Sequence, residues 1–217
     1  DSFSFYRHLR SKNPSPYMFY IDFEDYLITG SSPESLVQTN GRKVVTNPIA
    51  GTRPRGSTPE EDKALEEDLL TDQKEIAEHE MLVELSKEDL QAICQANSIE
   101  VPVNKRIVKY EHVMHLVSEV HGELRDSFTS FDALLACLPA GTVSGSPKQR
   151  AMQIINELEK VKRGVYAGGI GFISFNRDIN LAITIRSLVI KEEKAYLQVG
   201  AGIVKDSKPE LEFAETL

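Results

Sequence analysis

The sequence predicts an α+β fold with mainly antiparallel β-sheet. Short β-branched and aromatic stretches occur in pairs separated by turn residues, as at residues 18–21 and 25–29. Such pairs are typical of β-hairpins. Longer stretches with apolar residues at helical spacing, such as residues 72–86, separate the pairs. Hairpins and helix pairs thus follow one another in blocks, which favours α+β over an alternating parallel arrangement.

The remaining strands are expected from the same pattern. Residues 36–39 and 43–46 flank Asn40-Gly41, a dipeptide that favours a tight hairpin turn. The stretches 100–103, 105–110 and 111–118 are also rich in alternating apolar residues. The last third of the chain is rich in strands, predicted at residues 166–174, 179–189 and 194–200.

Helices are expected where capping residues precede an apolar repeat. Thr58 and Pro59 suit the cap and the first position of a helix that runs to about residue 70. A second helix covers residues 72–86. Further helices are predicted at residues 1–10, 130–137 and 147–161, and after Pro209.

Composition indicates a soluble globular protein. A chain of 217 residues fits one large domain or two small ones. The net charge of −8 argues against a nucleic-acid or anionic-membrane surface. Cys94 and Cys137 have no metal or disulfide spacing, and no signal or membrane-spanning stretch is present. We therefore expect a cytoplasmic protein.

Two acidic pairs are the main candidates for a metal site. Glu75 and Glu78, like Glu212 and Glu215, are three residues apart, so each pair leaves one face of a helix. If the two faces meet, four carboxylates require a cation, and oxygen ligands favour Mg²⁺. The alternative is two ordinary surface helices.

Five further residues are singled out by their positions in the sequence. Glu34 follows a turn and could face a pocket, or it could stabilise the first turn of a helix. His115 lies in an apolar run, where a histidine usually belongs to the core. Arg186 interrupts an apolar strand, so we expect an anionic partner for it. Arg53 and Arg55, beside Gly51, could receive a carboxylate or a phosphate.

Taken together, the motifs resemble those of the chorismate-utilising enzymes, and within them the anthranilate synthase component I branch. The matching stretches keep the family order along the whole chain. They cover residues 13–19, 30–34, 48–56, 74–79, 113–118, 139–148, 200–204 and 212–216. The resemblance implies one chorismate-binding catalytic domain over residues 1–217, with its sheets packed as a sandwich and its helices outside.

The resemblance also implies roles. Glu34 matches the general acid that protonates the departing ring hydroxyl of chorismate, and His115 matches the active-site histidine. Four glutamates match the Mg²⁺ ligands: Glu75, Glu78, Glu212 and Glu215. The substrate contacts are expected from Gly51, Thr52, Thr142, Tyr166, Arg186, Gly200, Ala201 and Gly202. Part of a tryptophan inhibitor site is expected from Asn13, Pro14, Ser15, Pro16, Tyr17 and Met18.

The implied reaction adds ammonia to chorismate and eliminates pyruvate, giving anthranilate for tryptophan biosynthesis. The ammonia would come from a glutamine amidotransferase subunit. Ala50 stands where aminodeoxychorismate synthases usually carry a lysine, and the form of residues 144–148 argues against isochorismate and salicylate synthases. Those enzymes, and a non-catalytic module that binds chorismate or tryptophan, remain the alternatives.

Two departures from the family pattern are visible. Residues 84–89 read Glu-Leu-Ser-Lys-Glu-Asp, where the family usually has Asp-Leu-Gly-Arg-Asn-Asp. Family members are also much longer than this chain. We therefore expect a C-terminal portion of a longer subunit, with weak or no activity on its own.

Overall fold

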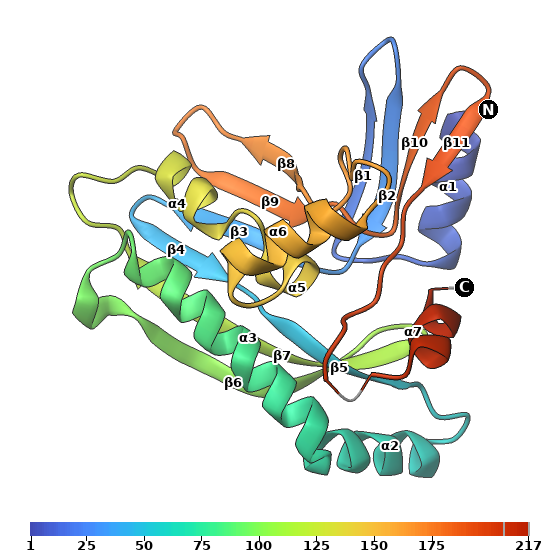
Figure 1. Cartoon of the computed structure of the whole chain (residues 1–217), viewed down its shortest axis with the longest axis horizontal. Coiled ribbons are helices and arrows are strands. Elements are labelled where there is room, and N and C mark those ends of the chain that lie inside the picture. Colours follow the sequence, from blue (N-terminus) through green and yellow to red (C-terminus); the bar gives the residue numbers. More distant parts are fainter. Residues whose placement is uncertain (206, 217) are drawn as a thin grey trace. The chain divides into compact units, whose positions relative to one another are not determined.

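A computed structural model describes residues 1–205 and 207–216, except for the side chain of Glu215 (Figure 1). The chain forms two compact units, each built from separate segments. The first unit comprises Asp1–Ser32, Pro139–Gly168 and Ile183–Leu217, and the second comprises Pro33–Leu138 and Gly169–Ala182. No helix in the described ranges is long and apolar enough to cross a membrane.

The first unit contains a four-stranded sheet in the order β1-β2-β10-β11. Its strands pair antiparallel, and Gly30 of β2 lies opposite both Phe19 of β1 and Ser187 of β10. The strands are β1 (Tyr17–Asp22), β2 (Leu27–Ser32), β10 (Ser187–Lys191) and β11 (Lys194–Leu197). The helices are α1 (Ser2–Lys12), α5 (Gly141–Ser144), α6 (Lys148–Leu158) and α7 (Pro209–Glu215).

The second unit contains a seven-stranded sheet, in which β5-β7-β4-β3-β9-β8 form one path and β6 pairs with β7. The strands are β3 (Ser35–Asn40), β4 (Lys43–Thr46), β5 (Ile49–Pro54), β6 (Glu100–Lys109), β7 (Val113–Glu123), β8 (Gly169–Ile173) and β9 (Ile179–Ile183). The long strand β7 carries β4 and β5 along one edge and β6 along the other, all antiparallel. It therefore organises this unit.

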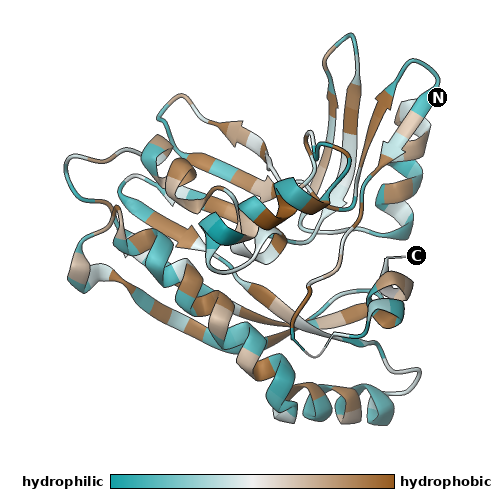
Figure 2. Cartoon of the chain, in the orientation of Figure 1, coloured by the Kyte–Doolittle hydropathy of each residue, from teal (hydrophilic) through white to brown (hydrophobic). Residues whose placement is uncertain are grey.

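Helices cover this sheet. They are α2 (Pro59–Thr71), α3 (Gln73–Gln91) and α4 (Ser130–Cys137), with a 3-10 turn, η1 (Ala96–Ser98). Helix α3 packs on β5 and β7, as Figure 1 shows. Hydrophilic residues dominate α2 and α3 in Figure 2, and hydrophobic residues alternate with hydrophilic ones along the strands. The core between α2 and the sheet includes the fully buried Leu69 of α2 and Met114 and Leu116 of β7.

The α+β prediction with antiparallel sheets is confirmed. Thr58 caps α2 and Pro59 opens it, as expected, because the Thr58 hydroxyl accepts a hydrogen bond from the Glu61 N–H at 3.2 Å. One strand prediction is wrong. Residues 179–189 form two strands, β9 and β10, because the chain bends at residues 184–186, where Arg186 adopts a φ of 51°.

Candidate active site

Strands β5 and β7 bring three predicted site residues together. Thr52 lies opposite His115 in the strand register, next to an irregularity at Gly51. The buried His115 ring places Nδ1 3.0 Å from the Thr52 hydroxyl and 3.2 Å from the Gly51 carbonyl oxygen. A carbonyl can only accept, so Nδ1–H donates to it, and Nε2 of the neutral ring is the atom that can take up a proton.

The carboxylate of Glu75 lies against the backbone of Gly51. Gly51 has a φ of +75°, and a Cβ atom there would lie 3.3 Å from Glu75 Oε2. Glycine tolerates this backbone conformation, whereas a side chain would be strained and would crowd the carboxylate.

Arg53 and Arg55 are both engaged by carboxylates of the chain. Arg53 Nε and Nη2 donate to Asp68 and Asp72, each at 2.6 Å. Arg55 Nε donates to Asp62 at 2.7 Å. The hydrogen bond that Arg53 donates to Asp68 raises the pKa of Arg53, despite the opposing effect of burial. The expectation that these two guanidiniums receive an external anion is therefore wrong.

Helix α3 presents the first predicted metal pair. Glu75 lies in its first turn, Glu78 lies three residues further on, and both are half-buried. The next residue, His79, is fully buried, and its Nε2 lies 2.7 Å from the Ser118 hydroxyl. Burial lowers the pKa of His79 to about 4, so its ring is neutral at neutral pH.

Glu34 belongs to neither a helix nor a strand. It lies between β2 and β3 and is 8% exposed. The alternative reading as a glutamate in the first turn of a helix is therefore wrong, and the residue is a buried carboxyl group. Its role as general acid stays a prediction.

In the first unit, a cavity of about 330 Å³ collects several predicted substrate contacts. Its lining includes Tyr166, Gly200 and Ala201. A Cβ atom at Gly200 would lie only 2.8 Å from the Tyr166 hydroxyl, so glycine allows this close approach. Burial raises the pKa of Tyr166. Two lining residues, Glu159 and Arg163, were not expected from the sequence.

Arg163 fixes the surroundings of Tyr166. It pairs with Glu159 at 2.6 Å, stacks over the Tyr166 ring at 5.5 Å, and donates to the Val143 carbonyl oxygen at 2.6 Å. The sequence carried no signal for this pair, because both residues lie beyond the end of α6 at Leu158, where the helical spacing rule does not apply. Beside Val143, the buried Thr142 hydroxyl has no hydrogen-bond partner among the described residues, so a ligand group could use it.

Two other predictions fall in the first unit. Arg186 is exposed on the bend between β9 and β10, and its carbonyl oxygen accepts a hydrogen bond from the Ser31 N–H. The expectation of a buried arginine that needs an anionic partner is therefore wrong. In the predicted inhibitor segment, the Asn13 carbonyl oxygen accepts from the Ser31 hydroxyl at 2.6 Å. Tyr17 and Met18 lie in β1.

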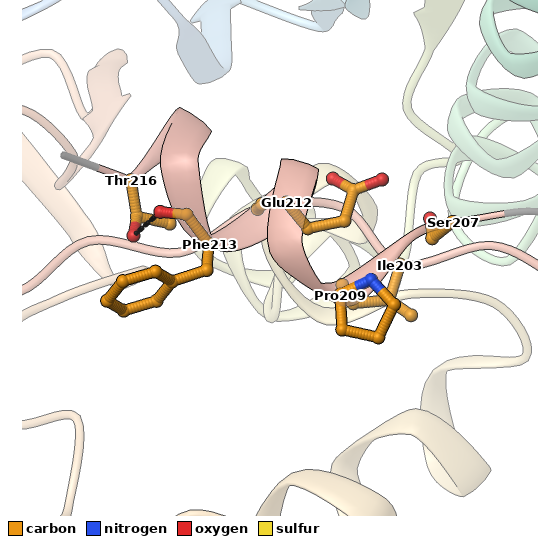
Figure 3. A pocket seen from close by; sticks show the side chains of 7 residues that line it. Ile203, Ser207, Pro209, Glu212, Phe213 and Thr216 are labelled. Carbon is orange, nitrogen blue, oxygen red and sulfur yellow. Dashed lines mark hydrogen bonds between the residues drawn. The ribbon is translucent and has the colours of Figure 1, made fainter.

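The second acidic pair lies on α7. Glu212 lines a separate cavity of about 320 Å³ together with Ala201, Ile203, Ser207, Pro209, Phe213 and Thr216. Figure 3 shows the Glu212 and Phe213 side chains leaving α7 in different directions. The side chain of Glu215 lies outside what the structure describes.

The donor chemistry of the acidic residues fits Mg²⁺. Glu75 and Glu78 offer carboxylate oxygens on adjacent turns of one helix, and Glu212 offers a third carboxylate on α7. Mg²⁺ commonly keeps several waters and takes one or two protein carboxylates plus oxygens of the substrate. Within the described ranges, no three potential metal-ligating side chains gather in one place.

A buried histidine, a buried carboxyl group and a helix bearing paired carboxylates suit acid–base chemistry assisted by a hard cation. Comparison with known proteins assigns the family. The whole chain, residues 1–217, matches the family model for chorismate binding enzymes. The chain belongs to the chorismate binding enzyme family.

Individual relatives agree with this assignment. The chain is 55% identical over 215 residues to anthranilate synthase component 1 of Lactococcus lactis subsp. lactis, covering 99% of this chain and 47% of that protein. Among solved structures, it resembles anthranilate synthase component I from Streptococcus pneumoniae TIGR4, with a TM-score of 0.93 and 51% identity. That match covers 100% of this chain and 48% of the other.

A more distant relative differs in named activity. The menaquinone-specific isochorismate synthase MenF from Escherichia coli matches with a TM-score of 0.84 and 30% identity, over 92% of this chain and 46% of that chain. The chain thus spans about half the length of the relatives that it matches.

Proposed function

We propose that this chain carries catalytic residues of an anthranilate synthase component I, which converts chorismate and ammonia to anthranilate and pyruvate. The observation that carries the proposal is that the chain has a higher sequence identity to anthranilate synthases than to an isochorismate synthase. The chain is 51–55% identical to proteins named anthranilate synthase component I or 1, but 30% identical to the isochorismate synthase from Escherichia coli. Ala50, where a nucleophilic lysine would mark aminodeoxychorismate synthases, supports the same branch.

In the first half of the reaction, the nitrogen of ammonia bonds to the chorismate ring as the ring C–O bond breaks. Hydroxide is a poor leaving group, so Glu34 gives it a proton and water departs. Glu34 suits this role because it is a buried carboxyl group, 8% exposed, in the same unit as His115. Bound Mg²⁺ would act as a Lewis acid toward the ring carboxylate.

In the second half, a ring proton is removed and the C–O bond between the ring and the enolpyruvyl group breaks. The ring becomes aromatic, and the departing enolpyruvate takes up a proton at its methylene carbon to become pyruvate. We assign His115 to this step. Its Nδ1–H donates a hydrogen bond to the Gly51 carbonyl oxygen, so its Nε2 can accept the proton. Thr52 keeps the ring in this orientation through its hydroxyl.

Substrate binding is assigned to the residues that match the substrate contacts of the family. Tyr166, Arg186 and the backbone at Gly200, Ala201 and Gly202 would hold the enolpyruvyl carboxylate, for which a guanidinium is well suited. Thr142 would offer its hydroxyl, and Gly51 and Thr52 would offer backbone groups. Glu75, Glu78, Glu212 and Glu215 are proposed to hold Mg²⁺, directly or through water.

Two further properties belong to the proposal. A glutamine amidotransferase subunit would supply the ammonia, and tryptophan would act as feedback inhibitor. The inhibitor would contact Asn13, Pro14, Ser15, Pro16, Tyr17 and Met18, which run from the end of α1 into β1. We propose a cytoplasmic enzyme of tryptophan biosynthesis.

The test is anthranilate fluorescence with chorismate, Mg²⁺ and an ammonium salt, using the complete product of the gene that encodes this chain. We expect anthranilate from the ammonium salt, none from glutamine without the amidotransferase, and a loss of about 100-fold or more in Glu34→Gln. Isochorismate, salicylate or aminodeoxychorismate as the chromatographic product would overturn the proposed branch. Chorismate binding without any product would indicate a binding module.

A further inference from the structure

We propose that Arg53 is a positioning residue that holds the Glu75 carboxylate in place for a bound cation. The inference rests on the proposed function, in which Glu75 is a Mg²⁺ ligand. It concerns only residues of the second unit, and its basis is the way one guanidinium joins β5 to the start of α3.

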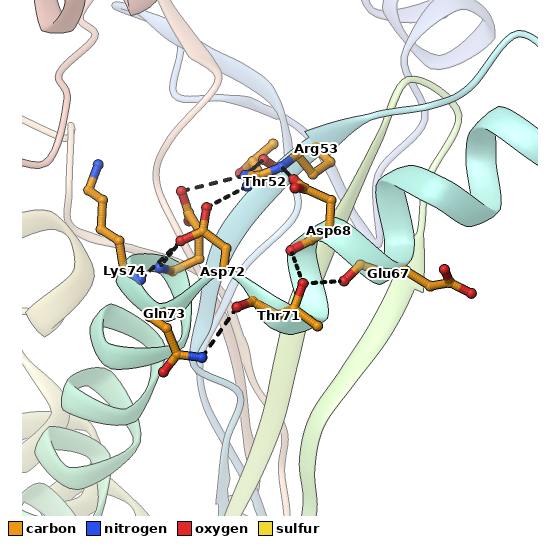
Figure 4. A network of polar contacts seen from close by, with 9 residues as sticks. Thr52, Arg53, Glu67, Asp68, Thr71, Asp72, Gln73 and Lys74 are labelled. Carbon is orange, nitrogen blue, oxygen red and sulfur yellow. Dashed lines mark hydrogen bonds and ion pairs between the residues drawn. The ribbon is translucent and has the colours of Figure 1, made fainter.

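The guanidinium of Arg53 faces three carboxylates at the junction of α2 and α3. Its Nε donates to Asp68 Oδ2 and its Nη2 to Asp72 Oδ2, each at 2.6 Å, and Nη1 lies 3.6 Å from Glu75 Oε1. Nη1 also donates to the Thr52 carbonyl oxygen at 3.0 Å. Figure 4 shows this network around the labelled Arg53. The arginine therefore ties its own strand to both helices.

Asp72 extends this hold to the backbone of Glu75. It is the N-cap of α3, and its Oδ1 accepts hydrogen bonds from the N–H groups of Lys74 and Glu75 at 2.9 and 3.2 Å. Its other oxygen, Oδ2, accepts a hydrogen bond from Arg53 Nη2. The guanidinium thus acts on Glu75 in two ways. It forms an ion pair with the Glu75 side chain, and it binds Asp72, which caps the helical turn that carries Glu75.

The other oxygen of the Glu75 carboxylate, Oε2, lies near Gly51, where an added Cβ atom would be 3.3 Å away. The carboxylate therefore has Arg53 near one oxygen and a glycine near the other. The Arg53 side chain is 18% exposed, so water screens these ion pairs less than it screens surface pairs. Asp72 and Glu75 are also substantially buried, at 30% and 19% exposure.

Charge alone does not account for this arrangement. A lysine at position 53 would keep the positive charge, but its single ammonium cannot reach three carboxylates and a carbonyl group at the same time. Arg53→Lys therefore separates positioning from charge balance. If only the charge matters, the lysine variant behaves like the unmodified protein.

Arg55 provides a matched control. It lies two residues further along the chain and also pairs with a carboxylate, Asp62, while donating to the Tyr110 carbonyl oxygen at 2.6 Å. Among the described residues, Arg55 donates to Asp62 and to the Tyr110 carbonyl oxygen, and not to Glu75 or the cap of α3. Arg55→Lys thus loses a comparable guanidinium pair without disturbing the proposed metal ligand.

The experiment is calorimetric titration of Mg²⁺ into the complete gene product carrying Arg53→Lys, Arg55→Lys or Glu75→Gln, with thermal unfolding of each variant measured alongside. We expect Arg53→Lys to weaken Mg²⁺ binding by about 10-fold or more, the usual effect of losing a residue that orients a metal ligand. Arg55→Lys should change the Kd for Mg²⁺ by less than about twofold, because Arg55 does not orient a proposed metal ligand.

The outcomes separate the two proposals. Unchanged binding in Arg53→Lys, with weakened binding in Glu75→Gln, would overturn the role of Arg53 alone. Unchanged binding in Glu75→Gln would overturn the metal assignment in the proposed function. If Arg53→Lys does not fold, Asp72→Asn replaces it, because asparagine preserves the cap but weakens the ion pair. Binding weakened about threefold or more would then support the role, and unchanged binding would overturn it.

Discussion

The Tyr166 hydroxyl leaves no room for a side chain at position 200. A Cβ atom there would lie 2.8 Å from it, which is closer than ordinary van der Waals contact. Because Arg163 stacks on the ring of Tyr166, the ring cannot move without losing that contact. We predict that Gly200→Ala displaces the hydroxyl and raises the KM for chorismate by about 10-fold, equivalent to about 1.4 kcal/mol, the scale of one hydrogen bond.

The control for Gly200→Ala is its combination with Tyr166→Phe, which removes the atom that the new methyl group meets. If the steric account is right, the alanine adds little to the effect of Tyr166→Phe, so the two substitutions are not additive. An alanine that is equally harmful in both backgrounds would instead show that the backbone at position 200 is the sensitive feature.

Residue types alone could not reveal how arginines are used. Arg53 and Arg55 look available in the sequence, yet both are held by carboxylates that α2 and the start of α3 bring back to β5. Arg186 looks buried because apolar residues surround it in the sequence, yet it lies exposed on a bend. Each outcome depends on tertiary contacts, which local patterns do not contain.

At the scale of elements, an ion-pair network fastens the start of α2 to the end of β6. The buried Asp62 carboxylate accepts from Arg55 Nε at 2.7 Å, Lys109 Nζ at 2.9 Å and the Gly56 N–H at 3.0 Å. The hydrogen bond from Arg55, followed by those from Lys109 and Gly56, holds the pKa of Asp62 well below its usual range. The folded state therefore favours the ionised carboxylate.

We predict that this network stabilises the protein at neutral pH and is lost in acid. The pKa of Asp62 is lower in the folded state, so the unfolded state binds the proton first. The contribution is complete above the unfolded pKa of about 4 and declines as pH falls toward the folded value. In urea unfolding, the stability difference between the unmodified protein and Asp62→Asn should be constant from pH 7 to about 5 and shrink below about 4.

Asp126→Asn is the control for this pH dependence. Asp126 also pairs with an arginine, Arg42, but its side chain is 98% exposed, so the pair contributes little. Its unfolding profile should follow that of the unmodified protein. A difference for Asp62→Asn that stays constant down to pH 3 would contradict the assigned cause.

Elements with strong local signals could be predicted from the sequence. Asp72 caps α3 and Thr58 caps α2, and both helices begin where expected. Helix α4 covers the predicted residues 130–137, and its cap is Thr129, which forms a reciprocal capping pair with Asp132. Within the site, the closeness of Gly51, Thr52 and His115 could not be predicted in this way, because it depends on the pairing of β5 with β7. The division of residues 179–189 could not be predicted, since the apolar run continues through the bend.

At the scale of the whole molecule, Mg²⁺ and chorismate are proposed to bind together. Mg²⁺ in proteins commonly takes oxygens of the substrate besides carboxylates of the chain, so we expect the chorismate carboxylate to be one of its ligands. We predict that chorismate tightens Mg²⁺ binding by about 10-fold or more, and that Mg²⁺ tightens chorismate binding by the same factor, as linkage requires. Calorimetric titrations of the complete gene product without an ammonium salt measure both factors and avoid turnover.

Glu78→Gln tests this linkage further. Because Glu78 lies one helical turn from Glu75 on α3, the variant should bind Mg²⁺ more weakly both with and without chorismate. Equal Mg²⁺ affinity in the presence and absence of chorismate, for the unmodified protein, would contradict the linkage.

The pairing of β2 with β10 also affects how the chain is made. Gly30 of β2 lies opposite Ser187 of β10, so the ribosome must synthesise most of the chain before this strand has both neighbours. At about 5–20 residues per second, the hydrogen-bonding edge of β2 waits on the order of ten seconds for its partner. During that interval β2 has only the hairpin with β1. The nascent chain therefore exposes an unpaired strand edge, the kind of surface that molecular chaperones protect from aggregation.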